Sequence, residues 1–218
     1  MKKALAFLMS AFLLMGITAC SGSEGSEIPA EGKDTTAVAV TESNEKASDE
    51  TEVLPVNDNP TTERTLVVVF SATGTTKGIA EKIAEYTDAD LYEITAAIPY
   101  SDEDRDWTDS DSRCTKEQND TSVRPEISSD TISLDGYTTI YIGYPIWFGQ
   151  EPRIMDTFVE SYNFDGITVI PFCTSGSSGI GQSGNNLAEN AGSGNWIEGK
   201  RFAGDASDEE IKEWIDSL

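Results

Sequence analysis

The sequence predicts an α/β domain with a doubly wound parallel sheet, in which helices cover both faces and give three layers. Apolar strands alternate with segments of helical periodicity over residues 63–218, which is typical of parallel sheets with right-handed crossovers. The runs 65–70 and 137–145 carry apolar residues on both faces, as expected of strands buried in a parallel sheet. Loops rich in Ser, Thr and Gly follow two strands, where such sheets bind ligands.

The first half of the domain contains one β–loop–α unit and a second short strand. Residues 90–94 alternate between apolar and polar and form that second strand. A long polar stretch, 95–130, follows it, and we expect a short helix within it over about 104–118. The helix after strand 65–70 has an apolar face made of Ile79, Ala80, Ile83 and Ala84.

The second half supplies three more strands. Strand 137–145 should be central, and Pro145 ends it because proline has no N–H for the ladder. Residues 167–173 form the fourth strand, and residues 196–202 hold a weak fifth strand. The sheet therefore has five strands.

Three helices connect or follow these strands. We expect them over 152–161, over 182–190, and from Ser207 onward, where Glu210 stands at the capping-box spacing. Their predicted apolar faces contain Ile154, Phe158 and Val159 in the first, and Ile211, Trp214 and Ile215 in the last.

A loop of small hydroxyl residues joins strand 65–70 to the first helix. Its hydroxyls and N–H groups suit a phosphate, because the helix N-terminus adds positive potential. It is not a Walker A loop, which ends in Gly-Lys-Ser/Thr, and the single Gly74 does not make a dinucleotide-binding fingerprint. A Ser/Thr-rich helix cap is the alternative interpretation. The loop consists of Ser71, Ala72, Thr73, Gly74, Thr75 and Thr76.

The pattern Ser-x-Thr-Gly-x-Thr after a strand closely resembles the phosphate loop of flavodoxins, which holds the 5′-phosphate of FMN. Thr75 stands where many flavodoxins carry Asn. The resemblance covers about residues 65–218 and implies a flavodoxin-like sheet of order 2-1-3-4-5 with FMN as cofactor. It also keeps segment 95–130 in the domain, because residues of this segment occur at similar places in a flavodoxin-like family of bacterial surface and cytosolic proteins. They are Tyr100, Trp107, Arg113, Arg124 and Pro125.

An aromatic loop follows strand 137–145, beside the first loop in the predicted sheet. It resembles the flavin-ring loop of flavodoxin-like proteins, and Trp147 offers the largest face for stacking on a flat ring. Gly149 permits a close or unusual turn of the backbone there. The alternative is that Trp147 and Phe148 are core residues that cover the end of the sheet. The loop contains Pro145, Ile146, Trp147, Phe148 and Gly149.

The loop after the fourth strand offers backbone amides for the pyrimidine edge of a flavin, and a flexible turn is the alternative. Short-chain flavodoxins usually place an aromatic residue here, whereas this loop has none. One face of the ring is therefore open, or is covered by Ile180 or by the segment that carries Tyr100 and Trp107. The predicted contacts in this loop are Thr174, Ser175, Gly176 and Gly179.

The N-terminus is typical of an exported protein. Residues 1–20 combine a basic start, an apolar stretch and a final Cys20, and so resemble the signal and lipobox of bacterial lipoproteins. The resemblance implies lipidation of Cys20 and a membrane anchor. A plain signal peptide and a cytosolic protein with an apolar start are the alternatives. Residues 21–62 are acidic and poor in apolar side chains, which predicts a disordered linker before the domain at 63–218.

Composition excludes several classes of function. The net charge of −24 argues against nucleic-acid binding, and the absence of His excludes the usual Ser-His-Asp and Cys-His catalysis and any His-bound metal. No residue is assigned a catalytic or metal-binding role. Cys114 and Cys173 form either a disulfide or, the alternative that we favour, two separate thiols.

These observations favour a membrane-anchored, exported FMN protein that acts in electron transfer as a monomer. Its partners would be redox proteins or a small-molecule electron acceptor. An FMN-dependent NAD(P)H or quinone oxidoreductase is the second hypothesis, because an open ring face would admit a nicotinamide or quinone. A flavin-free binding lipoprotein is the third.

Overall fold

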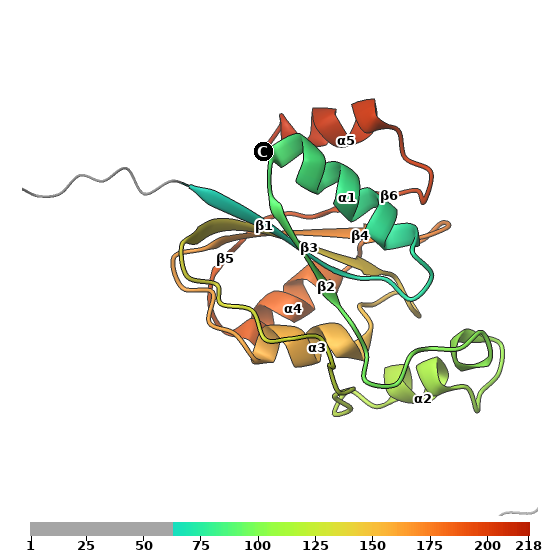
Figure 1. Cartoon of the computed structure of the whole chain (residues 1–218). Helices are drawn as coiled ribbons and strands as arrows, with labels where there is room; N and C mark the ends of the chain where they lie inside the picture. Colours follow the sequence, from blue (N-terminus) through green and yellow to red (C-terminus); the bar gives the residue numbers. More distant parts are fainter. Residues whose placement is uncertain (1–62) are drawn as a thin grey trace, which may run out of the picture. The chain divides into compact units, whose positions relative to one another are not determined.

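The computed structural model describes residues 63–218, which form a parallel sheet between two layers of helices (Figure 1). The predicted signal segment 1–20 and linker 21–62 lie outside the described residues. The strands are β1 Arg64–Phe70, β2 Asp90–Ile94, β3 Tyr137–Pro145, β4 Thr168–Thr174, β5 Asn195–Trp196 and β6 Lys200–Phe202. Their order is β2-β1-β3-β4-β5 with every pairing parallel, which confirms the predicted topology.

The predicted fifth strand is wrong in one respect, because residues 196–202 form two short strands instead of one. Both β5 and β6 pair with β4, and Pro171 of β4 lies between the two pairings. The Ile197 N–H, directly after β5, donates to the Val169 carbonyl of β4 at 3.0 Å. Pro171 lies two residues after Val169, so its backbone groups face the same side of β4. Proline has no N–H to offer, and the ladder is interrupted there.

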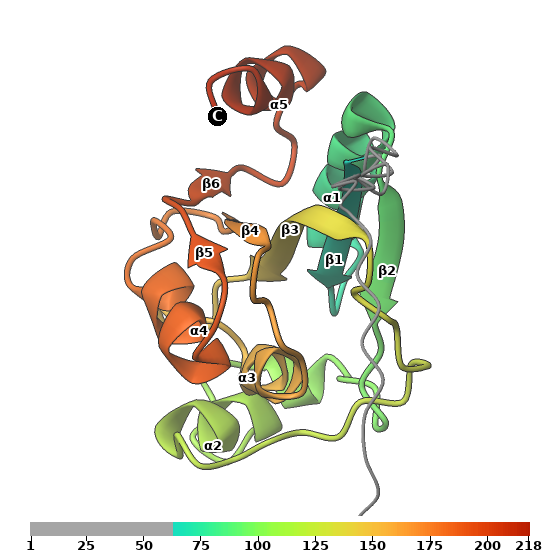
Figure 2. The ribbon, with the colours of Figure 1, turned by 90° about the vertical axis from the view of Figure 1, so that its left-hand side faces the viewer.

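Helices cover the two faces in pairs (Figure 2). Helices α1 Thr75–Thr87 and α5 Asp208–Ile215 cover one face, and α3 Arg153–Glu160 and α4 Ser183–Ala191 cover the other. Alternate residues of β1 feed the two cores, because successive side chains of a strand point to opposite faces. Val67 and Val69 pack with α1 and α5, whereas Leu66, Val68 and Phe70 pack with α3.

The predicted apolar faces of these helices are confirmed. The four residues named on α1 and the three named on α3 are buried. On α5, Ile211 and Trp214 are buried and Ile215 packs against the same core. Ser207 caps α5, and its Oγ accepts a hydrogen bond from the Glu210 N–H at 3.1 Å. Within residues 63–218, no helix is long and apolar enough to cross a membrane.

The helix expected over 104–118 is replaced by two shorter elements. A 3₁₀ turn, η1 Glu103–Arg105, and a helix, α2 Arg113–Asn119, are separated by a run of turns. Asp106 and Asp109 each accept a hydrogen bond from the backbone N–H two residues further on, at 2.9 and 2.8 Å. Aspartate side chains stabilise turns in this way in competition with helix, which explains why the helix begins only after Ser112.

Candidate functional site

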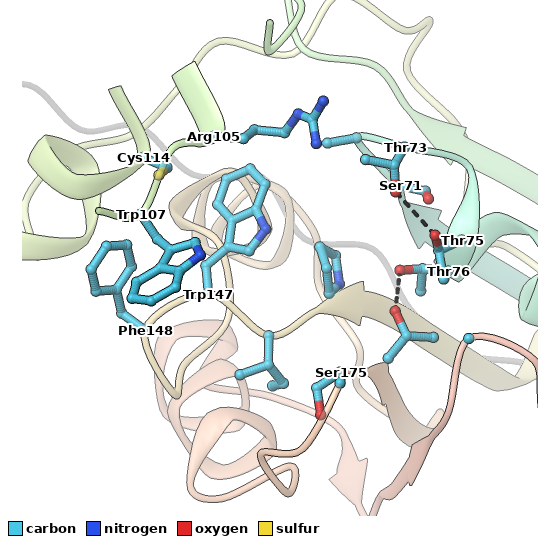
Figure 3. Close-up of a pocket in the computed structure, with 16 residues that line it drawn as sticks. Ser71, Thr73, Thr75, Thr76, Arg105, Trp107, Cys114, Trp147, Phe148 and Ser175 are labelled. Carbon is cyan, nitrogen blue, oxygen red and sulfur yellow. Dashed lines mark hydrogen bonds between the residues drawn. The ribbon is translucent and has the colours of Figure 1, made fainter. Parts of the chain in front are cut away.

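The carboxyl ends of β1, β3 and β4 open into a cavity of about 460 Å³ (Figure 3). Its wall is made by the three loops that the sequence singled out, together with part of segment 95–130. Three predicted residues, Gly74, Gly149 and Gly179, are not part of the lining. The predicted residues that do line the cavity are Ser71, Ala72, Thr73, Thr75, Thr76, Pro145, Ile146, Trp147, Phe148, Thr174, Ser175 and Gly176.

The loop after β1 presents hydroxyls and free helix-end amides to the cavity. Gly74 has a φ of +86° and is the N-cap of α1, and no side chain caps this helix within the described part of the chain. The alternative of a Ser/Thr helix cap is therefore wrong, and the amides of the first turn remain available to a ligand. The Thr76 and Thr174 hydroxyls share a buried hydrogen bond of 2.7 Å, which holds this loop against β4.

The aromatic loop after β3 is a tight turn with strained backbone. Trp147 and Gln150 exchange two backbone hydrogen bonds of 2.9 and 3.0 Å, and the residues between them both have positive φ. Gly149 adopts its φ of +79° freely, whereas Phe148 at +52° is a bulky side chain in the left-handed region. The turn directs Phe148, 46% exposed, to the mouth of the cavity.

Trp147 belongs to the core and to the cavity at the same time. Its ring packs edge to face on Phe70 and Tyr100, with centroids 5.8 and 5.0 Å away, and still lines the cavity. Tyr100 is itself fixed, because its hydroxyl donates to the Glu117 carboxylate at 2.6 Å. Burial and this carboxylate raise the pKa of Tyr100 well above its usual range. The indole therefore lies on a rigid support.

The loop after β4 is held from both sides. The Ile146 N–H donates to the Thr174 carbonyl at 3.0 Å, and the Arg201 Nε donates to the Ser175 hydroxyl at 3.2 Å. Ile180, proposed as a possible cover for the ligand, packs against the core formed with α3 and is not part of the lining.

Segment 95–130 supplies the remaining wall. Trp107 lines the cavity and is 73% exposed, and Figure 3 shows it with Trp147 and Phe148 on the side opposite the Ser71–Thr76 loop. Of Ile180 and this segment, the two covers that the sequence suggested, only the segment contributes to the described lining of the cavity. Three further lining residues were not predicted: Arg105, Cys114 and Gly204.

The unpredicted residues have different origins. Arg105 lies in the long polar stretch 95–130, and it is the one residue with a formal charge among the described residues that line the cavity. Gly204 allows close approach, since a Cβ there would lie 2.6 Å from Thr75 Cγ2. Cys114 and Cys173 are both buried free thiols, so the disulfide alternative is wrong. Burial raises the pKa of the Cys173 thiol to about 12.

A buried polar cluster lies directly behind the aromatic loop. Arg153, whose side chain is 4% exposed, lies between the carboxylates of Glu151 and Asp156, at 3.5 and 3.2 Å. It also donates to Gln150 Oε1 at 3.0 Å and to the Gln118 carbonyl at 3.3 Å. The cluster therefore joins the aromatic loop to α2 and α3.

Burial dominates the electrostatics of this cluster. It raises the pKa of both Glu151 and Asp156, against the lowering effect of Arg153 and of hydrogen bonds from neighbouring amides. The amides come from α4, where Asn186 and Asn190 donate to the two carboxylates. Among residues 63–218, no group of three or more His, Cys, Asp or Glu is placed to hold a metal ion.

Comparison with known proteins gives a consistent result. A family model described as Flavodoxin matches residues 64–218. A putative flavoprotein from Bacteroides uniformis is 47% identical, with 71% of this chain and 98% of that chain covered and a TM-score of 0.68. A putative flavoprotein from Bacteroides eggerthii is 41% identical, with 71% and 97% covered and a TM-score of 0.67.

A more distant solved structure is a flavoprotein in complex with FMN from Lactobacillus acidophilus. It is 26% identical, with 70% of this chain and 99% of that chain covered, and its TM-score is 0.55. No curated protein matches the chain.

Proposed function

The chain belongs to the flavodoxin family, and on this premise we propose that its domain binds FMN in the cavity and transfers electrons to a partner. The observation that carries the proposal is the division of the cavity into two chemically different halves. Hydroxyls and helix-end amides line one half, and aromatic rings line the other. A phosphorylated, flat, aromatic cofactor needs both.

The residues present fit FMN. Ser71, Thr73 and Thr76, with the amides of the first turn of α1, would hold its phosphate. Trp147 would lie against its ring from a position fixed by Phe70 and Tyr100. The solved relative from Lactobacillus acidophilus, a complex with FMN, supports the same cofactor.

The protein contributes binding and orientation, and FMN when bound supplies the redox chemistry. The hydrogen bond between Thr76 and Thr174 fixes the distance between the first and third loops. Trp147 and the residues below it exclude water from the inner side of the cavity. The outer side is bordered by the exposed rings of Trp107 and Phe148, through which a partner would approach.

The net charge of −24 favours a partner with a basic docking surface. We expect a soluble redox protein of that kind, or a small-molecule acceptor, to take the electrons. A second candidate, an FMN-dependent NAD(P)H or quinone oxidoreductase, is favoured by one observation. The loop after β4 carries no aromatic side chain over the cavity, which leaves room beside the ring for a second flat substrate.

Steady-state kinetics separates these candidates. The FMN-loaded chain is mixed with NADH or NADPH, with and without a quinone, and nucleotide oxidation is followed by absorbance. An electron carrier shows no sustained oxidation but accepts electrons from dithionite reversibly. Sustained turnover that requires bound FMN identifies an oxidoreductase. A chain that binds no FMN contradicts both candidates.

The proposal places this domain outside the cytoplasmic membrane, anchored by a lipid on Cys20, which lies outside the described residues. Detergent phase partition of the chain expressed in bacteria tests this placement. We expect the wild type to enter the detergent phase and the Cys20→Ser variant to remain in the aqueous phase. Equal partition of the two proteins would contradict lipid anchoring.

A further inference from the structure

Arg105 is a cation placed alone in the cavity of a strongly acidic protein. The chain carries a net charge of −24, and Arg105 is the one residue with a formal charge among the described residues that line the cavity. Its side chain is 25% exposed, and Figure 3 shows the guanidinium reaching across the cavity toward the loop that carries Ser71 and Thr73.

The Arg105 guanidinium does not use all of its N–H donors in contacts with the described residues. Its Nη2 pairs with the Asp102 carboxylate, whose side chain is 92% exposed. The Nε is buried, and no described residue accepts a hydrogen bond from it. A guanidinium has five N–H donors in a planar fork that matches two oxygens of a phosphate, so most of its capacity is unused here.

The other cations near the three loops are already engaged. Lys77, at the start of α1, pairs with Glu93 at 2.7 Å, and Arg201 donates to Ser175 behind the loop after β4. Neither of them lines the cavity. Among the described residues that line the cavity, Arg105 is therefore the one positive charge that an anionic ligand would meet, and it comes from segment 95–130 rather than from the hydroxyl loop.

We propose that Arg105 receives the phosphate of the bound flavin nucleotide and makes the cavity select phosphorylated flavin over unphosphorylated flavin. The inference rests on the proposed FMN site. The hydroxyls and amides of the Ser71–Thr76 loop give neutral hydrogen bonds to the phosphate, and Arg105 compensates its charge. Without this compensation, the negative potential of the protein would oppose entry of a dianion.

The test compares two flavins that differ only in the phosphate. The purified chain is freed of flavin and titrated with FMN and with riboflavin, and binding is read from quenching of flavin fluorescence. The variants are Arg105→Gln and Arg105→Lys. Arg64→Gln is the matched control, because it removes the same charge from the far end of β1, where Arg64 pairs with Asp90.

In Arg105→Gln we expect the dissociation constant for FMN to rise roughly 10- to 100-fold, while that for riboflavin stays within about twofold. Arg105→Lys keeps the charge without the fork and should fall between the wild type and Arg105→Gln. The loss of FMN affinity in Arg105→Gln, relative to the wild type, should become smaller in about 1 M salt, where the Debye length is only about 3 Å. Arg64→Gln should bind both flavins as the wild type does.

Three outcomes would overturn the inference. The first is an Arg105→Gln variant that discriminates between FMN and riboflavin as well as the wild type. The second is an equal loss for both flavins, which would mean that Arg105 shapes the wall and does not contact the phosphate. The third is a wild type that binds neither flavin, which would also overturn the proposed function, whereas the first two leave that function intact.

Discussion

The two walls of the cavity are built in opposite ways. The wall made by the Ser71–Thr76 loop comes from five residues of one short stretch, placed by a buried strand on one side and a helix N-terminus on the other. The wall made by segment 95–130 comes from Arg105, Trp107 and Cys114, which are separated by turns and held in place by distant contacts. The first wall is fixed by local structure and the second by tertiary packing.

The difference lies in what supports each wall. α1 begins at Thr75, directly after its left-handed N-cap Gly74, and its buried apolar face packs it against the sheet. Segment 95–130 instead depends on Tyr100 beneath Trp147 and on Gln118, whose amide donates to the Glu151 carbonyl at 3.0 Å. We therefore expect changes in the first wall to lower FMN affinity directly. Changes to the contacts that support the second wall should lower the free energy of unfolding.

The largest effect is expected from added negative charge on the first wall. Ser71→Asp/Thr73→Asp places two carboxylates where the phosphate would lie, and like-charge contact costs several kcal/mol. We expect FMN affinity to fall about 1000-fold or more, measured by fluorescence titration. The control is Thr131→Asp/Ser133→Asp, which adds the same two charges at the same spacing on exposed residues that do not line the cavity. Equal losses in both variants would contradict a phosphate site at this loop.

The next effect tests the support of the second wall. Arg153→Met leaves Glu151 and Asp156 buried without their cation, which we expect to lower the free energy of unfolding by about 3–5 kcal/mol. Chemical denaturation measures this change. Arg64→Met is the control, because its pair with Asp90 is about half exposed and should cost less than about 1 kcal/mol. Similar costs for the two variants would show that the buried cluster does not support the wall.

The pH dependence of stability tests the burial of Glu151 in the same cluster. Burial raises the pKa of Glu151 in the folded state above 4.5. The stability that protonated Glu151 contributes to the fold is therefore complete below this value, and it is lost as pH rises through the folded pKa. The stability of the wild type relative to Glu151→Gln should therefore fall as pH rises above 4.5 toward the folded pKa, by up to about 1.4 kcal/mol per pH unit. Glu189→Gln, at an exposed position on α4, is the control variant and is measured over the same pH range. A relative stability that rises with pH would contradict the burial argument.

The smallest effect concerns the strained turn at Phe148, which lies beside Trp107 of the second wall. Phe148→Gly removes the strain of a left-handed conformation, which costs the folded state about 1–2 kcal/mol. Glycine loses more conformational freedom on folding, which opposes this gain by about 0.5–1 kcal/mol. We expect unfolding to become harder by up to about 1 kcal/mol while FMN affinity falls about 2- to 10-fold. Phe148→Ala keeps the strain but loses the ring, so it should match the loss of affinity without the gain in stability. A destabilised Phe148→Gly variant would contradict the strain argument.

The same contrast decides how much could be predicted from the sequence. The sheet order, the buried helix faces and twelve lining residues could be predicted, because each depends on local periodicity or on a contiguous motif. The helix expected over 104–118 was wrong, because Asp106 and Asp109 stabilise turns there. The split of the fifth strand depends on Pro171 in a neighbouring strand, and the position of Arg105 depends on packing between distant segments. Local patterns do not contain that information.

The visible absorption spectrum of the purified chain, recorded after FMN is added and the excess removed, tests the FMN site most directly. If both walls hold the cofactor, the wild type retains about one flavin per chain. The Ser71→Asp/Thr73→Asp variant retains none, and Thr131→Asp/Ser133→Asp retains as much as the wild type. A folded wild-type protein that stays colourless would contradict the assignment of this cavity to FMN.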